Sequence, residues 1–137
     1  MKAVILAGGK GTRLAPYTKI LPKPLMPIGD KPILEVLLVQ LRQAGITDIV
    51  LSVGHMAELI EVYFKDGRQL GVNLTYSLES SPLGTAGPLA LIDGLDEPFM
   101  VMNGDVLTTL CFGDLVAYHH KQAAAATIAM YCRNVKI

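Results

Sequence analysis

Three glycines and two basic side chains lie close together near the N-terminus, in the segment LAGGKGTRL (residues 6–14). Glycine lets the backbone approach a ligand closely, and consecutive free N–H groups can bind phosphate oxygens. Arg13 adds a permanently charged, forked donor that suits phosphate. The segment is not a GxxxxGK loop followed by Ser or Thr, because Lys10 precedes Gly11, and it is not a GxGxxG loop, because Leu14 replaces the third glycine. It predicts either another kind of phosphate-binding turn or an ordinary tight strand-to-helix turn.

A second basic residue lies in a proline-rich stretch, LPKPLMP (residues 21–27). Prolines fix φ and remove hydrogen-bond donors, so this stretch is expected to be extended and stiff. Lys23 lies between Pro22 and Pro24, and a stiff backbone leaves less conformational entropy to lose when the lysine binds an anion. The alternative is a solvated lysine on a proline-rich loop, but the neighbouring glycine segment favours the anion-binding interpretation.

Short apolar runs alternate with stretches of helical periodicity, which predicts an α/β fold with a doubly wound, mainly parallel sheet. Strands are expected over residues 2–6, 49–53, 73–78, 99–102 and 126–131, and helices over residues 30–45, 55–64, 85–92 and 112–121. The first, second and fourth runs are continuously apolar, as in central strands covered on both faces, whereas the third alternates and is expected nearer an edge.

The order of these elements indicates where a ligand would bind. Asp30 is expected to cap the first helix, with Pro32 in its first turn. In open α/β sheets, ligands bind beyond the carboxyl ends of the strands. The glycine segment follows the first expected strand, and Asn103, Gly104 and Asp105 follow the fourth. These segments are therefore the predicted place for chemistry.

The composition is that of one folded domain without a strong charge. The 137 residues include 12 basic and 12 acidic side chains, and 51% are hydrophobic against 18% charged, which excludes a disordered chain. This balance gives no indication of a nucleic-acid or membrane partner. The most apolar stretch, residues 33–41, is much shorter than the roughly 20 residues of a membrane span. With two isolated cysteines, Cys111 and Cys132, a cytoplasmic protein is expected.

Taken in order, LAGGKGTRL, LPKPLMPIGDKPILE, PLGTAG and NGD resemble the nucleotidyltransferases that join nucleoside triphosphates to sugar 1-phosphates. The resemblance covers nearly the whole chain and implies a Rossmann-like nucleotidyltransferase fold over residues 1–137. It implies that Arg13 and Lys23 are catalytic, because they neutralise the reacting phosphates, and that Asp105 binds Mg²⁺. Without the resemblance, Asp105 could equally be a helix cap or an Asx-turn residue.

The resemblance also implies a nucleotide site. Its expected members are Leu6, Ala7, Gly8, Gly9, Gly11, Thr12, Arg13, Glu79, Pro82, Gly84, Thr85, Ala86, Asn103 and Gly104. Glu79 could accept hydrogen bonds from guanine N1–H and N2–H₂ together, whereas an amide would suit thymine or uracil better. The stretch SLESSPLGTAGPLAL is similar to the mannose-1-phosphate guanylyltransferase branch, so GTP is favoured. The alternative for Glu79 is a carboxylate that simply faces water.

The family's catalytic unit is longer than this chain. Its later part carries a second metal-binding aspartate and the sugar-binding residues, neither of which can be assigned here. The chain is therefore expected to bind a nucleoside triphosphate while transferring it to a sugar 1-phosphate poorly or not at all. Alternatives are a non-catalytic regulatory subunit or a structural module whose loops bind nothing. A homo-oligomer, or association with the missing C-terminal portion, is expected, and uncovered apolar faces would explain the mean hydropathy of +0.41.

Overall fold

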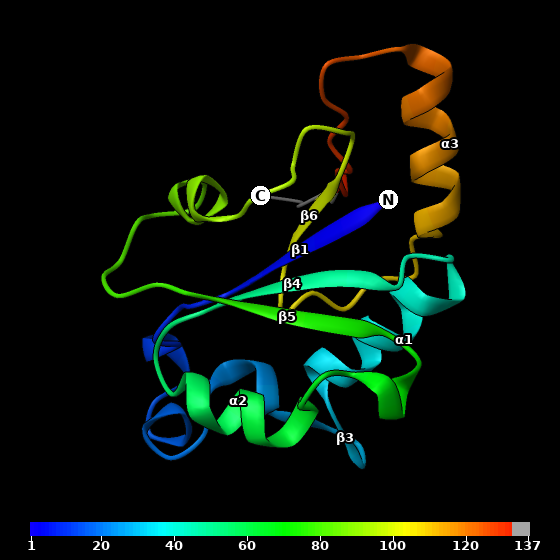
Figure 1. Ribbon diagram of the computed structural model, residues 1–137. Helices are drawn as coiled ribbons and strands as arrows, with labels where there is room; N and C mark the ends of the chain where they lie inside the picture. Colours follow the sequence, from blue (N-terminus) through cyan, green and yellow to red (C-terminus); the bar gives the residue numbers. More distant parts are fainter. Residues whose placement is uncertain (133–137) are drawn as a thin grey trace, which may run out of the picture.

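The computed structural model describes residues 1–132 and contains a central sheet of four parallel strands (Figure 1). The strands are β1 (Lys2–Ala7), β4 (Asp48–Val53), β5 (Asn73–Leu78) and β6 (Met100–Asn103), in the order β5-β4-β1-β6. β1 pairs with β4 and with β6, and β4 pairs with β5, in each case in parallel. The predicted α/β class with a mainly parallel sheet is confirmed, and so is the edge position of β5.

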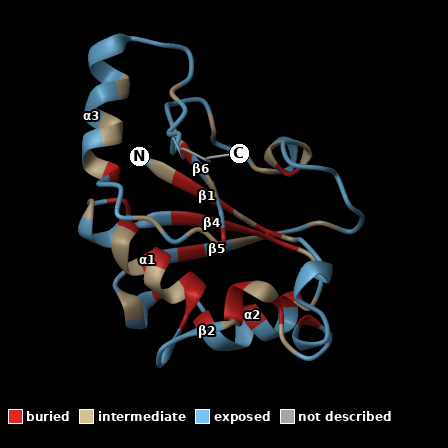
Figure 2. Cartoon of the chain, turned by 180° about the vertical axis from the view of Figure 1, so that it is seen from behind, coloured by how far each residue is buried: buried red, intermediate tan, exposed pale blue. Residues whose placement is uncertain are grey.

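The main core lies between one face of this sheet and the helices. These are α1 (Ile33–Gln43), α2 (Ala57–Phe64) and α3 (Phe112–Gln122). On α1, four leucines at helical spacing are fully buried: Leu34, Leu37, Leu38 and Leu41. They belong to one cluster with Ile5 and Leu51 of the central strands and with Phe64 of α2. Figure 2 shows the buried residues concentrated in these strands and in α1 and α2, whereas α3 is mostly exposed and buries only Phe112.

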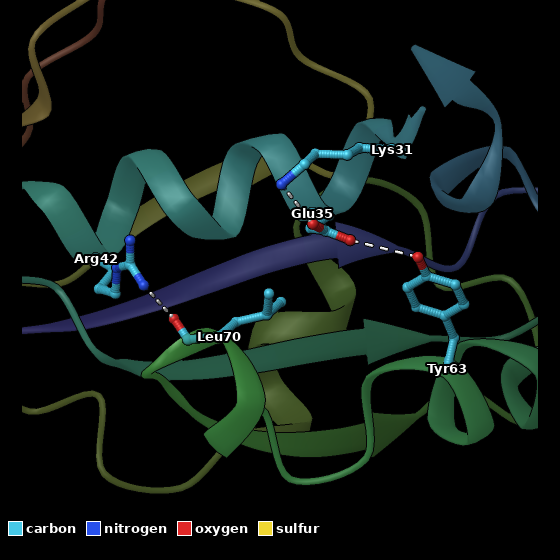
Figure 3. A network of polar contacts seen from close by, with 5 residues as sticks. All are labelled: Lys31, Glu35, Arg42, Tyr63 and Leu70. Atoms are coloured by element: carbon cyan, nitrogen blue, oxygen red, sulfur yellow. Dashed lines mark hydrogen bonds and ion pairs between the residues drawn. The ribbon is translucent and has the colours of Figure 1, made fainter. Parts of the chain in front are cut away.

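Polar contacts fix α1 against its neighbours at two points (Figure 3). Near its beginning, Glu35 accepts a hydrogen bond from the Tyr63 hydroxyl of α2 at 3.3 Å and forms an ion pair with Lys31 at 3.0 Å. Near its end, Arg42 donates to the carbonyl oxygen of Leu70 at 3.0 Å, in the 3₁₀ helix η4 (Arg68–Leu70). The hydrogen bond with Glu35 raises the pKa of the Lys31 ammonium.

The first helix begins later than the sequence indicates. Asp30 is exposed, and α1 begins at Ile33 with Pro32 as its N-cap and no capping hydrogen bond from a side chain. The reason is a short hairpin, β2 (Pro27–Ile28) with β3 (Lys31–Pro32), whose turn contains Gly29 at φ 65°. Similarly, α2 begins at Ala57 rather than residue 55, because Met56 has a left-handed backbone conformation.

Two other sequence predictions are wrong in part. Residues 85–92 contain no α-helix but the short 3₁₀ helix η5 (Gly87–Leu91), in which Pro88 removes a backbone donor near the start. β6 starts at Met100 and lies at a sheet edge within the described residues, so Val101 is 41% exposed rather than covered.

The predicted strand over residues 126–131 does not form in the described part of the chain. Its apolar side chains are exposed, Ile128 by 81% and Met130 by 85%. An apolar run becomes a strand only where a neighbouring strand supplies hydrogen bonds and a surface to pack on. Within residues 1–132, no helix is long and apolar enough to cross a membrane.

Candidate functional site

A cavity of about 570 Å³ opens at the carboxyl ends of β1 and β6, beside the loop that follows β5. Because the strands are parallel, these ends meet at one edge of the sheet, where open α/β sheets bind ligands. The residues that line the cavity are Leu6, Ala7, Gly8, Gly9, Gly11, Thr12, Arg13, Leu14, Lys23, Pro24, Glu79, Pro82, Leu83, Gly84, Thr85, Pro88, Asn103, Gly104 and Asp105.

The glycine segment after β1 turns tightly and leads into the 3₁₀ helix η1 (Thr12–Leu14). Gly11 has φ 60°, and the buried side chain of Thr18 donates a hydrogen bond to its carbonyl oxygen at 2.9 Å. A Cβ atom on Gly11 would lie 2.8 Å from Thr18 Cγ2 and 3.3 Å from Lys23 Cβ. Both the backbone conformation and the space therefore require glycine, and the glycine segment packs directly on the lysine segment.

Lys23 extends from the 3₁₀ helix η3 (Lys23–Leu25) and is held by its two prolines, both of which are buried. The predicted stiffness is present, but the stretch is extended only at Pro22 and again from Met26 onward, with a helical turn in between. The Lys23 ammonium forms an ion pair with the Asp105 carboxylate, and about a third of each side chain is exposed to solvent. A lysine and a carboxylate from separate segments are thus brought together at the cavity.

Asp105 is fixed by the glycine that precedes it. The Gly104 N–H donates to the carbonyl oxygen of Leu6 at 2.9 Å, which continues the pairing of β6 with β1. A Cβ on Gly104 would lie 3.2 Å from Ile5 Cγ2 and 3.4 Å from Ala7 Cβ. This close approach brings the Asp105 backbone against the end of β1, beside the glycine segment.

Glu79 lies at the end of β5 and is hydrogen-bonded at two points. Its backbone N–H donates to the carbonyl oxygen of Val53 at 2.8 Å, and its Oε1 accepts from Ser52 Oγ at 2.8 Å. A Cβ on Gly8 would lie only 2.4 Å from Oε1. Glu79 is therefore partly buried against the glycine segment rather than being a freely solvated loop carboxylate.

Residues 2–136 match the family model described as "Nucleotidyl transferase". This chain belongs to the nucleotidyl transferase family. The match extends over nearly the whole chain and includes every segment that lines the cavity.

Relatives of this nucleotidyl transferase chain are longer than the chain itself. The mannose-1-phosphate guanyltransferase of Schizosaccharomyces pombe is 46% identical over 135 residues, which cover 95% of this chain and 37% of the relative. A Bacillus anthracis protein described as a glucose-1-phosphate thymidylyltransferase, solved in complex with sucrose, has a TM-score of 0.81 and 32% identity, covering 89% of this chain and 51% of that one. HddC from Yersinia pseudotuberculosis, solved with GMP-PN, has a TM-score of 0.73 and 31% identity, covering 86% and 53%.

Most residues that the sequence predicts for the site line the same cavity. Ala86 is the exception: it is exposed and is not part of the cavity wall. The sequence does not predict four residues of the wall: Leu14, Pro24 and Leu83, which lie next to predicted members, and Pro88, which follows the predicted segment. It also does not predict Ser52, although a serine in the otherwise apolar run IVLSV is an unusual residue for a buried strand.

Asp105 is the residue that could hold a divalent cation in a nucleotidyl transferase of this geometry. Among residues 1–132, no three His, Cys, Asp or Glu side chains gather into a metal site. Mg²⁺ usually takes one or two carboxylates and completes its shell with phosphate oxygens and water. The Asp105 carboxylate, which pairs with Lys23 in a cavity that Arg13 also lines, therefore fits a cation that binds together with a phosphate ligand, rather than one held by protein ligands alone.

Proposed function

We propose that this chain binds a nucleoside triphosphate, with GTP favoured, and forms the nucleotide-binding part of an enzyme that transfers a nucleotidyl group to a sugar 1-phosphate. The observation that carries the proposal is that the glycine segment, Arg13, Lys23, Glu79 and Asp105 all line one cavity. One ligand could then contact three kinds of group: donors that bind its phosphates, the Asp105 carboxylate through a cation, and the Glu79 carboxylate through its base. Pyrophosphate would be the second product.

The chemistry of this reaction matches the residues present. A sugar 1-phosphate oxygen attacks the α-phosphorus, and pyrophosphate leaves in line with it. The attacking phosphate is already anionic near neutral pH, so the protein needs to position the reactants and neutralise their charge rather than supply a base. Arg13 and Lys23 are proposed to bind the phosphate oxygens, and backbone N–H groups of the glycine segment to bind beside them.

A magnesium ion, where present, would stabilise negative charge on the phosphates. Asp105 is the residue proposed to hold it. Lys23 would then exchange its ion pair with Asp105 for a contact with phosphate, because both partners gain a ligand of opposite charge. This exchange leaves the lysine on the phosphate and the carboxylate available to the cation.

Guanine is favoured by the carboxylate of Glu79. Guanine presents two neighbouring donors, N1–H and N2–H₂, and a carboxylate can accept from both. The Schizosaccharomyces pombe relative, which is named a guanyltransferase, supports guanine as the base. The Bacillus anthracis structure is described as a thymidylyltransferase, so proteins of similar fold are also described with thymine as the base.

A second candidate function is nucleotide binding without transfer. It is favoured by the lining of the cavity, in which every contact proposed here is made to the nucleotide.

Nucleotide binding and turnover can be tested separately. Thermal unfolding with GTP, UTP, dTTP and ATP in the presence of Mg²⁺ measures binding, because a ligand at 100 times its Kd adds about 2.7 kcal/mol of stability. We expect stabilisation by GTP and slow or no release of pyrophosphate when mannose 1-phosphate is added. Stabilisation by none of the four would contradict the proposal. Rapid pyrophosphate release would contradict the second candidate and show that this chain suffices for transfer.

A further inference from the structure

Ser52 is a buried polar residue in the middle of the sheet. It lies on β4 between Leu51 and Val53, and all three residues are fully buried. A hydroxyl group removed from water needs a hydrogen-bond partner, and such groups in folded proteins almost always have one. The partner of the Ser52 hydroxyl is Oε1 of Glu79, at 2.8 Å. Ser52, although it is buried in the core, is therefore connected to the cavity wall through the side chain of Glu79.

Glu79 is held by this contact and by its own backbone. The hydrogen bond from its N–H to Val53 extends the pairing of β5 with β4 by one residue, which aligns Glu79 beside Ser52. The carboxylate then lies against Gly8, where a Cβ would be 2.4 Å from Oε1 and 3.5 Å from Oε2. Both carboxylate oxygens are thus near the glycine segment that lines the cavity.

The hydrogen bond from Ser52 leaves most of the carboxylate free to accept. An ionised carboxylate offers about four lone-pair sites on its two oxygens. Ser52 occupies one of them on Oε1, so that oxygen and Oε2 can both still accept from a ligand. Two acceptors side by side match two neighbouring N–H donors on one edge of a base.

Holding the side chain before the ligand binds also has a thermodynamic effect. A free glutamate side chain loses rotamer entropy when a ligand immobilises it, and this loss weakens binding. A carboxylate already fixed by a buried hydroxyl loses less. The effect acts on the contact with the base and leaves the contacts with the phosphates unchanged.

We propose that Ser52 is a positioning residue that fixes the Glu79 carboxylate for recognition of a base with two adjacent N–H donors. The inference rests on the proposed recognition of guanine by Glu79. It gives Ser52, which lies outside the cavity wall, a role in selecting the nucleotide. Ser52 itself contacts no ligand.

GTP and ITP differ by the exocyclic amine of guanine, which ITP lacks. The second carboxylate oxygen of Glu79 would accept a hydrogen bond from that amine, so the test compares the affinities for these two nucleotides. Affinities for GTP, ITP and UTP are measured by calorimetric titration with Mg²⁺, for the unchanged protein and for Ser52→Ala, Ser52→Thr, Glu79→Ala and Ser77→Ala. Ser77 is a matched control, because it is the register partner of Ser52 on β5 and lies outside the cavity wall. Chemical unfolding of each variant separates loss of fold from loss of selectivity.

We expect Ser52→Ala to lower the GTP-to-ITP affinity ratio by about 5- to 10-fold, because a carboxylate that is no longer held accepts less well from the exocyclic amine, and this fold-change is the net contribution of one typical hydrogen bond. Glu79→Ala should lower the ratio at least as much. Ser52→Thr, which keeps the hydroxyl, and Ser77→Ala should preserve it. A general loss of structure would lower the affinities for GTP and ITP together and would leave their ratio unchanged.

Each inference fails in a different way. If Glu79→Ala lowers the ratio and Ser52→Ala does not, the positioning role is wrong and guanine recognition by Glu79 stands. If neither changes the ratio, both are wrong. If the protein prefers UTP and both variants reduce that preference, the assignment of guanine is wrong, and so is the proposed recognition of two adjacent N–H donors, although Ser52 would still position Glu79.

Discussion

The Lys23 ammonium and the Asp105 carboxylate form an ion pair across the cavity at the carboxyl edge of the sheet. Lys23 is held by flanking prolines, and Asp105 by the hydrogen bond that Gly104 makes to β1. Neither charge is deeply buried, so each remains able to exchange its partner for a ligand. The pair therefore keeps a phosphate-binding cation and a metal-binding anion next to each other in the ligand-free protein.

Replacing Lys23 with alanine should weaken binding of GTP by about tenfold, because a charge-assisted contact with phosphate is lost. The free energy of unfolding should change by less than about 1 kcal/mol, since an exposed ion pair contributes little to stability. Calorimetric titration and chemical unfolding measure the two effects. Lys10→Ala is the matched control, because Lys10 lies in the glycine segment but outside the cavity wall. Equal affinities for the two variants would contradict a role for Lys23.

Replacing Asp105 with asparagine should remove the effect of Mg²⁺ on nucleotide binding. Without divalent cations, GTP should bind the variant at least as tightly as the unchanged protein, because a negative charge near the phosphates is gone and Lys23 has lost its partner. The comparison is the ratio of GTP affinities with and without Mg²⁺. Asp114→Asn is the control, because Asp114 is exposed on the first turn of α3. An unchanged Mg²⁺ effect in Asp105→Asn would show that the cation binds elsewhere.

The parts of the site that the sequence predicts well are short segments with strong local constraints. Gly11 has a left-handed backbone and no room for a Cβ, and Lys23 is enclosed by prolines, so residue type alone indicates their local backbone structure. The sequence predicts β1 and β4 from their continuous apolar runs and β5 from its alternating one. In each case the information lies within a few consecutive residues.

What the sequence does not predict depends on contacts between distant segments. Ser52 reaches the site only because β4 and β5 pair in a register that aligns it with Ser77, two residues before Glu79. Residues 126–131 have the composition of a strand but do not form one in the described part of the chain, because no neighbouring strand pairs with them there. Gly29 similarly allows the turn of the β2–β3 hairpin. Residues 31 and 32 therefore form a strand, whereas helix-capping rules would place them in the first turn of α1.

Stability should fall in alkaline solution through Tyr76. Its hydroxyl donates to the carbonyl oxygen of Lys65 at 2.6 Å, and burial, with Glu61 and Asp66 nearby, raises the pKa of Tyr76 to about 12. The unfolded chain has a tyrosine pKa of about 10. A raised pKa means that the stabilisation is complete below pH 10 and is lost as the pH rises towards 12.

The alkaline effect is measured as the free energy of unfolding between pH 8 and 12, alongside the absorbance change of tyrosine ionisation. Tyr76→Phe should be somewhat less stable near pH 8, because the hydrogen bond to Lys65 is lost, and should show a weaker fall above pH 10. Tyr118→Phe is the control, because Tyr118 is 56% exposed on α3. The same alkaline slope in both variants would mean that Tyr76 is not responsible.

The two neighbouring glycines Gly8 and Gly9 should respond differently to alanine. A Cβ at Gly8 would lie 2.4 Å from Oε1 and 3.0 Å from Cδ of Glu79, whereas at Gly9 nothing lies within 4 Å. Gly8→Ala must therefore displace the Glu79 carboxylate and break its hydrogen bond with Ser52. Because that carboxylate is proposed to select the base, the preference for GTP over ITP should fall by about 5- to 10-fold.

Gly9→Ala is the matched control for this steric argument. It alters the same glycine segment and lines the same cavity, but it leaves Glu79 in its position. Its GTP-to-ITP ratio should equal that of the unchanged protein, even where the added methyl group lowers both affinities. If both alanine variants lower the GTP-to-ITP ratio to the same extent, the glycine segment itself selects the base. If only Gly8→Ala does, selectivity depends on the geometry of Glu79, because the two substitutions add the same group and differ in whether it meets that carboxylate.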